Sequence, residues 1–237
     1  MSAQRMLLLF NFLITHIPGS RAGKLKVWWL RKSGVKIADG VQIGNGVKVK
    51  LHNAKLRIGK DCRINDNVMF NLCGSELEIE NCVVLQEFVS FFSEGSGGCC
   101  KIADGVIIRK RVDFEYNCGG KILIGEDSEI NHGTLLAANC GATITIGSNV
   151  RIAHFISMKC TTHAIDPKSE ICIAGDTLAK DISIGDGTWV GGSATILPGV
   201  SVGNRCIIAG GAVVTKDVPD GVLVAGVPAV VKKNYYV

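Results

Sequence analysis

The sequence has little proline, few aromatic residues and little charge. Of its 237 residues, 5 are proline, 6% are aromatic and 20% are charged, while 47% are hydrophobic. This composition excludes a disordered or fibrous chain and fits one domain or one repeat array. The net charge is only +5 and is spread out, apart from basic clusters at residues 21–32 and 109–111. DNA would require a denser basic face, so we expect no nucleic acid partner.

Two cysteine arrangements are missing from the sequence. None of the ten cysteines forms a CxxC pair, which argues against a zinc ribbon, and we expect no metal. There is no short cysteine framework and no cleavable signal peptide, so we expect a cytoplasmic protein with reduced thiols. Cys62, Cys82 and Cys206 stand where the repeat described below has Val or Ser elsewhere. We interpret these three as small buried apolar groups.

No hydrophobic run is long enough to span a bilayer. The longest begins at Met6 and ends at Ile17, about twelve residues where about 20 are needed. We expect residues 1–34 to be helical and to pack on the end of the fold. The alternative is an interfacial anchor, with residues 6–32 contacting the inner face of the cytoplasmic membrane through basic side chains, Trp28 and Trp29.

Glycine, in contrast, is abundant, with 29 residues that punctuate a repeat of six. Three sets of apolar residues recur in step with one another. The first set is Ile58, Ile79, Ile102, Ile124, Ile146, Ile184 and Val202; the second is Ile64, Leu85, Ile108, Ile130, Ile152, Val190 and Ile208; the third is Phe70, Phe91, Phe114, Leu136, Met158, Ile196 and Val214. Residues six apart lie on opposite faces of an α-helix, so the repeat predicts short strands separated by turns.

Three such strands make one triangular coil, and stacked coils bury their apolar columns. We therefore predict an all-β solenoid, a parallel β-helix over residues 35–214, followed by a closing segment at 215–237. Steps along the first column are 18–23 residues, except for one of 38 between Ile146 and Ile184. The excess predicts a long loop at 160–181, and loops of this length in a compact array are usually functional.

The segment from Ile184 to Ala229, "IGDGTWVGGSATILPGVSVGNRCIIAGGAVVTKDVPDGVLVAGVPA", is preceded by "TTHAID". It resembles the hexapeptide-repeat acyltransferases, and most closely the O-acetyltransferases of maltose, galactosides and nodulation factors and the sugar acetyltransferases of O-antigen and capsule clusters. The resemblance implies a left-handed β-helix, a homotrimer, acetyl-CoA as donor and a sugar hydroxyl as acceptor. It also implies an active site between neighbouring subunits.

The resemblance assigns roles to particular residues. His163, which opens the long loop, matches the catalytic histidine of the family, and a histidine is suited to removing the hydroxyl proton at neutral pH. Asn131 matches an asparagine that hydrogen-bonds the acceptor and the histidine. Apart from the resemblance, the position of Asp166 three residues after His163 makes it a candidate to orient His163 or bind the sugar; the alternative is that it starts a turn before Pro167. Residues matching the CoA groove are Trp189, Gly192, Gly210, Thr215 and Lys216; for Trp189 the competing interpretation is packing under the long loop.

Other interpretations remain open at this point. Many relatives have a basic residue near the position of Val230, so Lys232 or Lys233 would have to serve the CoA phosphates here. His132 and His154 do not have the spacing of the metal-binding histidines in γ-type carbonic anhydrases. The leading function is sugar O-acetylation in bacterial surface polysaccharide synthesis. The alternatives are N-acetylation of an amino-sugar nucleotide, or a non-catalytic β-helix that scaffolds a membrane assembly.

Overall fold

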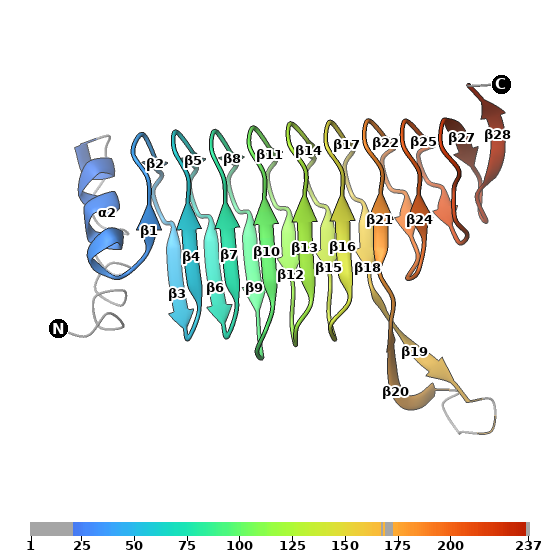
Figure 1. The fold of residues 1–237 in the computed structure, drawn as a ribbon, viewed down its shortest axis with the longest axis horizontal. Coiled ribbons are helices and arrows are strands. Elements are labelled where there is room, and N and C mark those ends of the chain that lie inside the picture. Colours follow the sequence, from blue (N-terminus) through green and yellow to red (C-terminus); the bar gives the residue numbers. More distant parts are fainter. Residues whose placement is uncertain (1–20, 167, 169–172, 236–237) are drawn as a thin grey trace.

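The computed structural model describes residues 21–166, 168 and 173–235. It shows one helix, α2 (Arg21–Lys32), followed by a solenoid of short strands that runs the length of the molecule (Figure 1). The predicted apolar run at residues 6–17, the first twenty residues of the expected helical segment and Pro167 lie outside the described residues. None of the helical structure described is long and apolar enough to cross a membrane.

Each coil contributes one strand to each of three parallel sheets, here called A, B and C. Sheet A contains β1 (Lys36–Ile37), β4 (Lys55–Ile58), β7 (Glu76–Ile79), β10 (Cys99–Ile102), β13 (Lys121–Ile124), β16 (Thr143–Ile146), β21 (Ile182–Ile184) and β24 (Ser201–Val202). Sheet B contains β2 (Gln42–Ile43), β5 (Arg63–Ile64), β8 (Val84–Leu85), β11 (Ile107–Ile108), β14 (Glu129–Ile130), β17 (Arg151–Ile152), β22 (Trp189–Val190), β25 (Ile207–Ile208), β27 (Val222–Ala225) and β28 (Val230–Asn234). Sheet C contains β3 (Lys48–His52), β6 (Met69–Cys73), β9 (Ser90–Ser93), β12 (Asp113–Glu115), β15 (Leu135–Ala137), β18 (Ser157–Lys159), β23 (Thr195–Ile196) and β26 (Val213–Val214).

The three predicted columns are confirmed, one for each sheet. In sheet A, Ile58 pairs with Ile79 and the register continues to Val202, with Ile37 adding one coil before the first that the sequence predicted. The second column lies in sheet B and the third in sheet C. Strands alternate exposed and buried residues, because successive side chains point to opposite faces of a sheet. The fold prediction of a parallel β-solenoid with a short N-terminal helix therefore holds.

The core of sheet C contains a ladder of phenylalanines. Phe70, Phe91 and Phe114 are at most 1% exposed. Their rings stack with centroids 5.4 Å apart for the first pair and 4.5 Å for the second, at interplanar angles of 9° and 11°. Because the same inner position repeats in every coil, aromatic residues there meet face to face along the solenoid axis.

The prediction for Cys82 was wrong. Cys62 and Cys206 are buried as expected, but Cys82 is exposed. It occupies the same turn position as Asp61, where both residues have a positive φ of 55–58°. The following residue, Val83, fills the inner position that Cys62 has one coil earlier. The inner position was predicted one residue too early. Because neighbouring positions face opposite ways, this error assigned an exposed side chain to the core.

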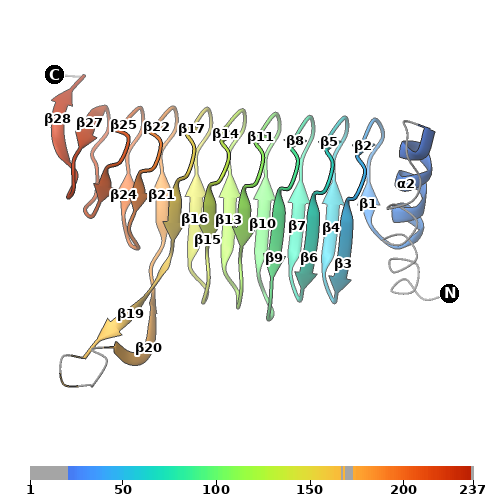
Figure 2. The same cartoon turned by 180° about the vertical axis from the view of Figure 1, so that it is seen from behind.

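The regular coil is interrupted once, between β18 and β21. Here β19 (Thr161–Ile165) and β20 (Ile173–Ala179) pair antiparallel and project from the corner between sheets C and A as a hairpin (Figure 2). This hairpin lies within the predicted loop at 160–181. At the far end, β27 extends sheet B and β28 folds back on it antiparallel, which closes the array.

Candidate active site

His163 lies on the projecting hairpin. It sits in β19 opposite Thr177 of β20, and the register of the hairpin shifts between His163 and Ile165. The side chain of His163 is exposed. The break in the repeat thus presents an imidazole to solvent, away from the wall of coils, where it can accept a proton from a ligand.

Asp166 ends the strand that carries His163. Its Oδ1 accepts a hydrogen bond from the backbone N–H of Lys168 at 2.9 Å. This is the geometry of an aspartate that starts a turn. The structure therefore gives Asp166 a local role in shaping the tip of the hairpin, which was one of the two interpretations that the sequence left open.

Gly192 and Gly210 lie on a different corner, the one between sheets B and C. A Cβ at Gly192 would lie 3.5 Å from the nearest atom, the backbone oxygen of His154, so the surrounding chain has room for a side chain. A Cβ at Gly210 would meet the oxygen of Gly192 at 3.2 Å. Gly191 differs, because a Cβ there would lie 2.6 Å from the backbone nitrogen of Gly210. Packing within the chain thus requires a glycine at position 191. At position 192 packing does not require one, and the glycine there would be explained by the close approach of a ligand to the backbone.

A wall of rings stands beside these glycines. His132 and His154 occupy the same turn position in successive coils, and their rings stack with centroids 4.7 Å apart at 20°. The ring of Phe155 packs edge-on against the ring of His132, with centroids 5.0 Å apart, and the Phe155 side chain is 59% exposed. In the next two coils Gly192 and Gly210 occupy the position of the histidines. The row of rings therefore ends there, and the backbone has no side chain at this position. From the sequence we compared the two histidines only with metal ligands, although their spacing of one coil predicts the stack.

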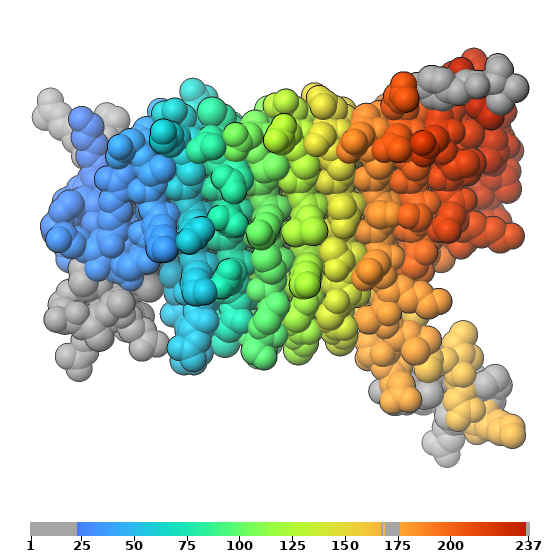
Figure 3. Space-filling view, in the orientation of Figure 1, coloured from blue at the N-terminus to red at the C-terminus, as the bar shows by residue number. Residues whose placement is uncertain are grey.

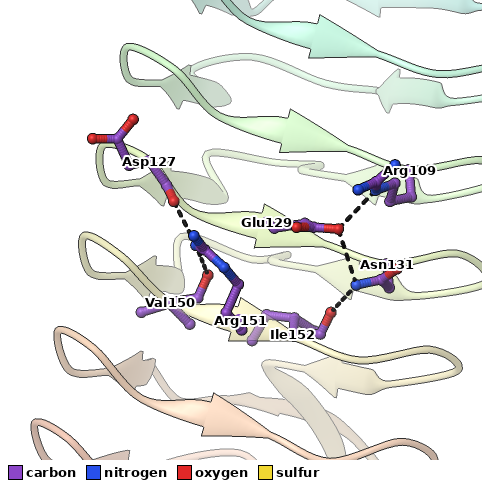
Figure 4. A network of polar contacts seen from close by, with 7 residues as sticks. All are labelled: Arg109, Asp127, Glu129, Asn131, Val150, Arg151 and Ile152. Atoms are coloured by element: carbon purple, nitrogen blue, oxygen red, sulfur yellow. Dashed lines mark hydrogen bonds and ion pairs between the residues drawn. The ribbon is translucent and has the colours of Figure 1, made fainter.

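Asn131 lies on this same corner within a polar network (Figure 4). Its amide nitrogen donates to the backbone oxygen of Ile152 at 3.2 Å and to Glu129 at 3.4 Å. Glu129 also accepts a hydrogen bond from Arg109 Nε at 2.7 Å. Because both amide protons are used within the chain, Asn131 would meet a ligand hydroxyl through its Oδ1 acceptor.

Trp189 is on the outer face of sheet B. It pairs with Arg151 in one neighbouring coil and with Ile207 in the other, and it is 53% exposed. The hairpin leaves from the C–A corner, which lies opposite sheet B in a three-sided coil. Within one chain, Trp189 and the base of the hairpin therefore lie on different sides of the coil. A half-exposed indole on the face of a sheet is suited to contact a flat ligand group or a partner.

Thr215 and Lys216 follow β26 at the C–A corner, two coils beyond the strand that leads into the hairpin. Both side chains are exposed. Lys232 and Lys233 are exposed on β28, where the Nζ of Lys233 lies 4.8 Å from the ring centroid of Tyr235. These lysines provide positive charge at the C-terminal end of the solenoid for an anionic ligand.

Apart from Trp189, which lies on the face of sheet B, the predicted site residues fall into two groups on one chain. His163, Asp166, Thr215 and Lys216 follow strands of sheet C at the C–A corner, whereas Asn131, Gly192 and Gly210 follow strands of sheet B. The two corners are separated by the width of sheet C.

The thiol of Cys160, at the base of the hairpin, is not a candidate nucleophile. Burial raises the pKa of Cys160, at the base of the hairpin, to about 11, and the nearby Asp181 carboxylate adds to this effect. A thiol with so high a pKa is almost entirely protonated at neutral pH. Among the described residues, no group of three or more His, Cys, Asp or Glu side chains is arranged to hold a metal ion.

Comparison with known proteins bears on this site. The family described as bacterial transferase hexapeptide (six repeats) matches residues 181–216. The galactoside O-acetyltransferase of Escherichia coli (strain K12) is 32% identical over 142 residues, which is 57% of this chain and 67% of that protein. The chain belongs to the hexapeptide-repeat acetyltransferase family.

Two further proteins are similar to this family member. The protein YJL218W of Saccharomyces cerevisiae (strain ATCC 204508 / S288c) is 36% identical over 131 residues, 55% of this chain and 63% of the yeast protein. The chain therefore spans less than two thirds of that relative. The crystal structure of the polySia-specific acetyltransferase NeuO superposes with a TM-score of 0.60 at 28% identity, covering 84% of this chain and 87% of NeuO.

Proposed function

We propose that the protein is an acetyl-CoA-dependent O-acetyltransferase that acts on a sugar hydroxyl, with His163 as general base. The observation that carries this proposal is the placement of His163 on the one hairpin that interrupts the solenoid, next to the segment that matches the family. Membership in an acetyltransferase family and similarity to galactoside and polySia acetyltransferases support the reaction and the acceptor class.

The reaction exchanges a C–S bond for a C–O bond and moves one proton, by way of His163, from the hydroxyl to the sulfur. The imidazole of His163 accepts the proton of the sugar hydroxyl while its oxygen attacks the thioester carbon. The C–O bond forms, the C–S bond breaks, and the proton held by His163 passes to the departing CoA sulfur. Backbone N–H groups near Gly192 and Gly210 can approach the developing oxyanion, because no Cβ intervenes there.

The working assembly in this proposal is a homotrimer with each active site between two subunits. The separation of the predicted residues onto two corners of one chain supports this arrangement. The hairpin also exposes two apolar side chains, Ile165 at 80% and Leu178 at 45%. Apolar groups on a projecting element are commonly covered by a partner. In the trimer, the hairpin of one subunit brings His163 to the B–C corner of the next. That corner carries Gly192 and Gly210, here called the glycine corner, beside the stacked rings of His132 and His154.

The acceptor in this proposal is a saccharide of bacterial surface polysaccharide synthesis, and the protein works on the cytoplasmic side, where acetyl-CoA is made. The name of NeuO, a polySia-specific enzyme, supports a polysaccharide acceptor. Acetyl transfer from acetyl-CoA to a panel of sugars, sugar nucleotides and oligosaccharides tests the proposal. Amino sugars in the same panel distinguish it from N-acetylation, since they offer both an amine and hydroxyls.

A further inference from the structure

The outward face of α2 combines apolar and basic side chains. Lys26 and Leu30 point into the solenoid and are at most 5% exposed. Lys26 Nζ donates to the backbone oxygen of Gly44 and to Asn45 Oδ1, both at 2.9 Å. The opposite side, called here the α2 outer face, consists of Lys24, Leu25, Trp28 and Lys32, all of which are exposed. Positions three, four and seven apart share one face of a helix, so these side chains form one surface.

The apolar part of the α2 outer face is unusually open for a helix end that packs on a core. Leu25 is 49% exposed and Trp28 is 50% exposed. Trp29 holds the Trp28 ring in an edge-on contact with centroids 5.9 Å apart at 63°. The indole therefore has a supported orientation and an open face, instead of folding back on the solenoid.

Positive charge is concentrated at this same end of the molecule. Residues 21–50 contain eight Lys or Arg and one Asp, a net charge of +7, whereas the whole chain carries +5. All other residues together therefore carry −2. Arg31 pairs with that one aspartate, Asp39, at 2.8 Å, and α2 has no acidic residue in its first turn. Figure 3 shows this segment, in blue, at the opposite end of the molecule from the hairpin.

We propose that the α2 outer face docks on an anionic lipid bilayer. Tryptophan and leucine beside lysines match the headgroup region, where indole rings prefer to lie and where anionic lipids attract basic side chains. A soluble polyanion would use the charge but gain nothing from the open Leu25 and Trp28. Docking by this end leaves the hairpin and the glycine corner in water at the other end. The inference is independent of the acetyltransferase reaction and needs no acyl donor.

Co-sedimentation of the full chain with vesicles tests the proposal. Vesicles of phosphatidylcholine alone are compared with vesicles containing one quarter phosphatidylglycerol, at 50 and 500 mM salt. We expect binding to the anionic vesicles, weakened by salt because exposed charges are screened. The double substitution Leu25→Ser/Trp28→Ala should reduce the partition coefficient about tenfold or more, since membrane affinity scales with the buried apolar area. Lys24→Glu/Lys32→Glu should reduce it by a similar factor on anionic vesicles.

Matched controls are available at the other end of the solenoid. Trp189→Ala removes a tryptophan of similar exposure, and Lys159→Glu reverses an exposed charge. Both should bind vesicles as the unmodified chain does, and circular dichroism and melting should show all variants folded. Failure of the unmodified chain to bind anionic vesicles would overturn the proposal. So would binding that survives Leu25→Ser/Trp28→Ala, or capture of soluble polysialic acid in preference to vesicles, because the surface would then recognise charge alone.

Discussion

Gly192 and His154 lie side by side on the B–C corner, and the described residues leave room there for a side chain at position 192. A Cβ at Gly192 would lie 3.7 Å from Cδ2 of the His154 ring, an ordinary contact distance. We expect Gly192→Leu to fold with little loss of stability but to obstruct the groove. Its Kd for CoA should rise about tenfold or more, the equivalent of about 1.4 kcal/mol. Isothermal titration calorimetry and a thermal melt measure the two effects.

Gly191→Ala is the control for this substitution. Its Cβ would lie 2.6 Å from the nitrogen of Gly210 and 2.8 Å from the oxygen of Ile208, so neighbouring coils would have to move apart. We expect a loss of about 1–3 kcal/mol in the free energy of unfolding, as for other overpacked sites. Equal effects of both substitutions on CoA affinity and stability would show that Gly192 is structural as well.

The phenylalanine ladder should carry a large share of the stability of the middle coils. Phe91 is fully buried between two rings, so Phe91→Ala leaves a cavity that the flanking coils cannot close. We expect the free energy of unfolding in urea to fall by about 3–5 kcal/mol. Phe88→Ala, three residues earlier and 51% exposed, should change it by less than about 0.5 kcal/mol. Similar losses for both would contradict the packing described.

The three apolar columns of the solenoid show how much of the fold the sequence predicted. The inner positions must be apolar in every coil, so the spacing of six was visible without any structure, and every predicted column residue has its predicted neighbours. The turns were harder to read, because several residue types tolerate a positive φ there. Cys82 was therefore assigned to the core although it occupies the turn position of Asp61.

The candidate site was less accessible from the sequence. His163 stood out because it lies where the repeat fails, but the assignment of Gly192, Gly210 and Lys216 came from resemblance. The two corners could have been predicted from the repeat, because Gly192 and Gly210 follow the second apolar column whereas His163 and Lys216 follow the third. We did not use the columns in this way. The His132–His154 stack was missed because the spacing of the two residues was compared only with that of a metal site.

The hairpin should contribute to assembly. If Ile165 and Leu178 pack against a partner subunit, Ile165→Asp/Leu178→Asp should convert trimers to monomers, because two buried charges would then lack partners. Multi-angle light scattering gives the mass directly. Leu25→Asp, which changes a side chain of similar exposure on α2, should leave the trimer intact. A double variant that stays trimeric would mean that the hairpin lies outside the interface.

Seven of the described cysteines, those that are either exposed or buried, should divide into two classes in their reaction with maleimide. Cys82, Cys118 and Cys140 are exposed, whereas Cys62, Cys100, Cys160 and Cys206 are buried. Burial raises the pKa of the Cys100 thiol well above its usual range and that of Cys160 to about 11. At pH 7.5 we expect rapid labelling of the exposed class and labelling of the buried class only after denaturation, with mass spectrometry of peptides as the readout. Fast labelling of Cys160 in the native protein would contradict the packing at the base of the hairpin.

The central claim is that His163 is the base of an acetyl transfer, and the most direct measurement is free-thiol release from acetyl-CoA with a saccharide acceptor. We predict acceptor-dependent turnover by the unmodified chain, and a kcat lower by about 10²–10⁴-fold in His163→Ala, the usual contribution of a general base. His52→Ala, which removes another exposed histidine, should leave kcat unchanged. Full activity in His163→Ala would contradict the assignment of the base, and failure of the unmodified chain to bind CoA would favour a non-catalytic scaffold.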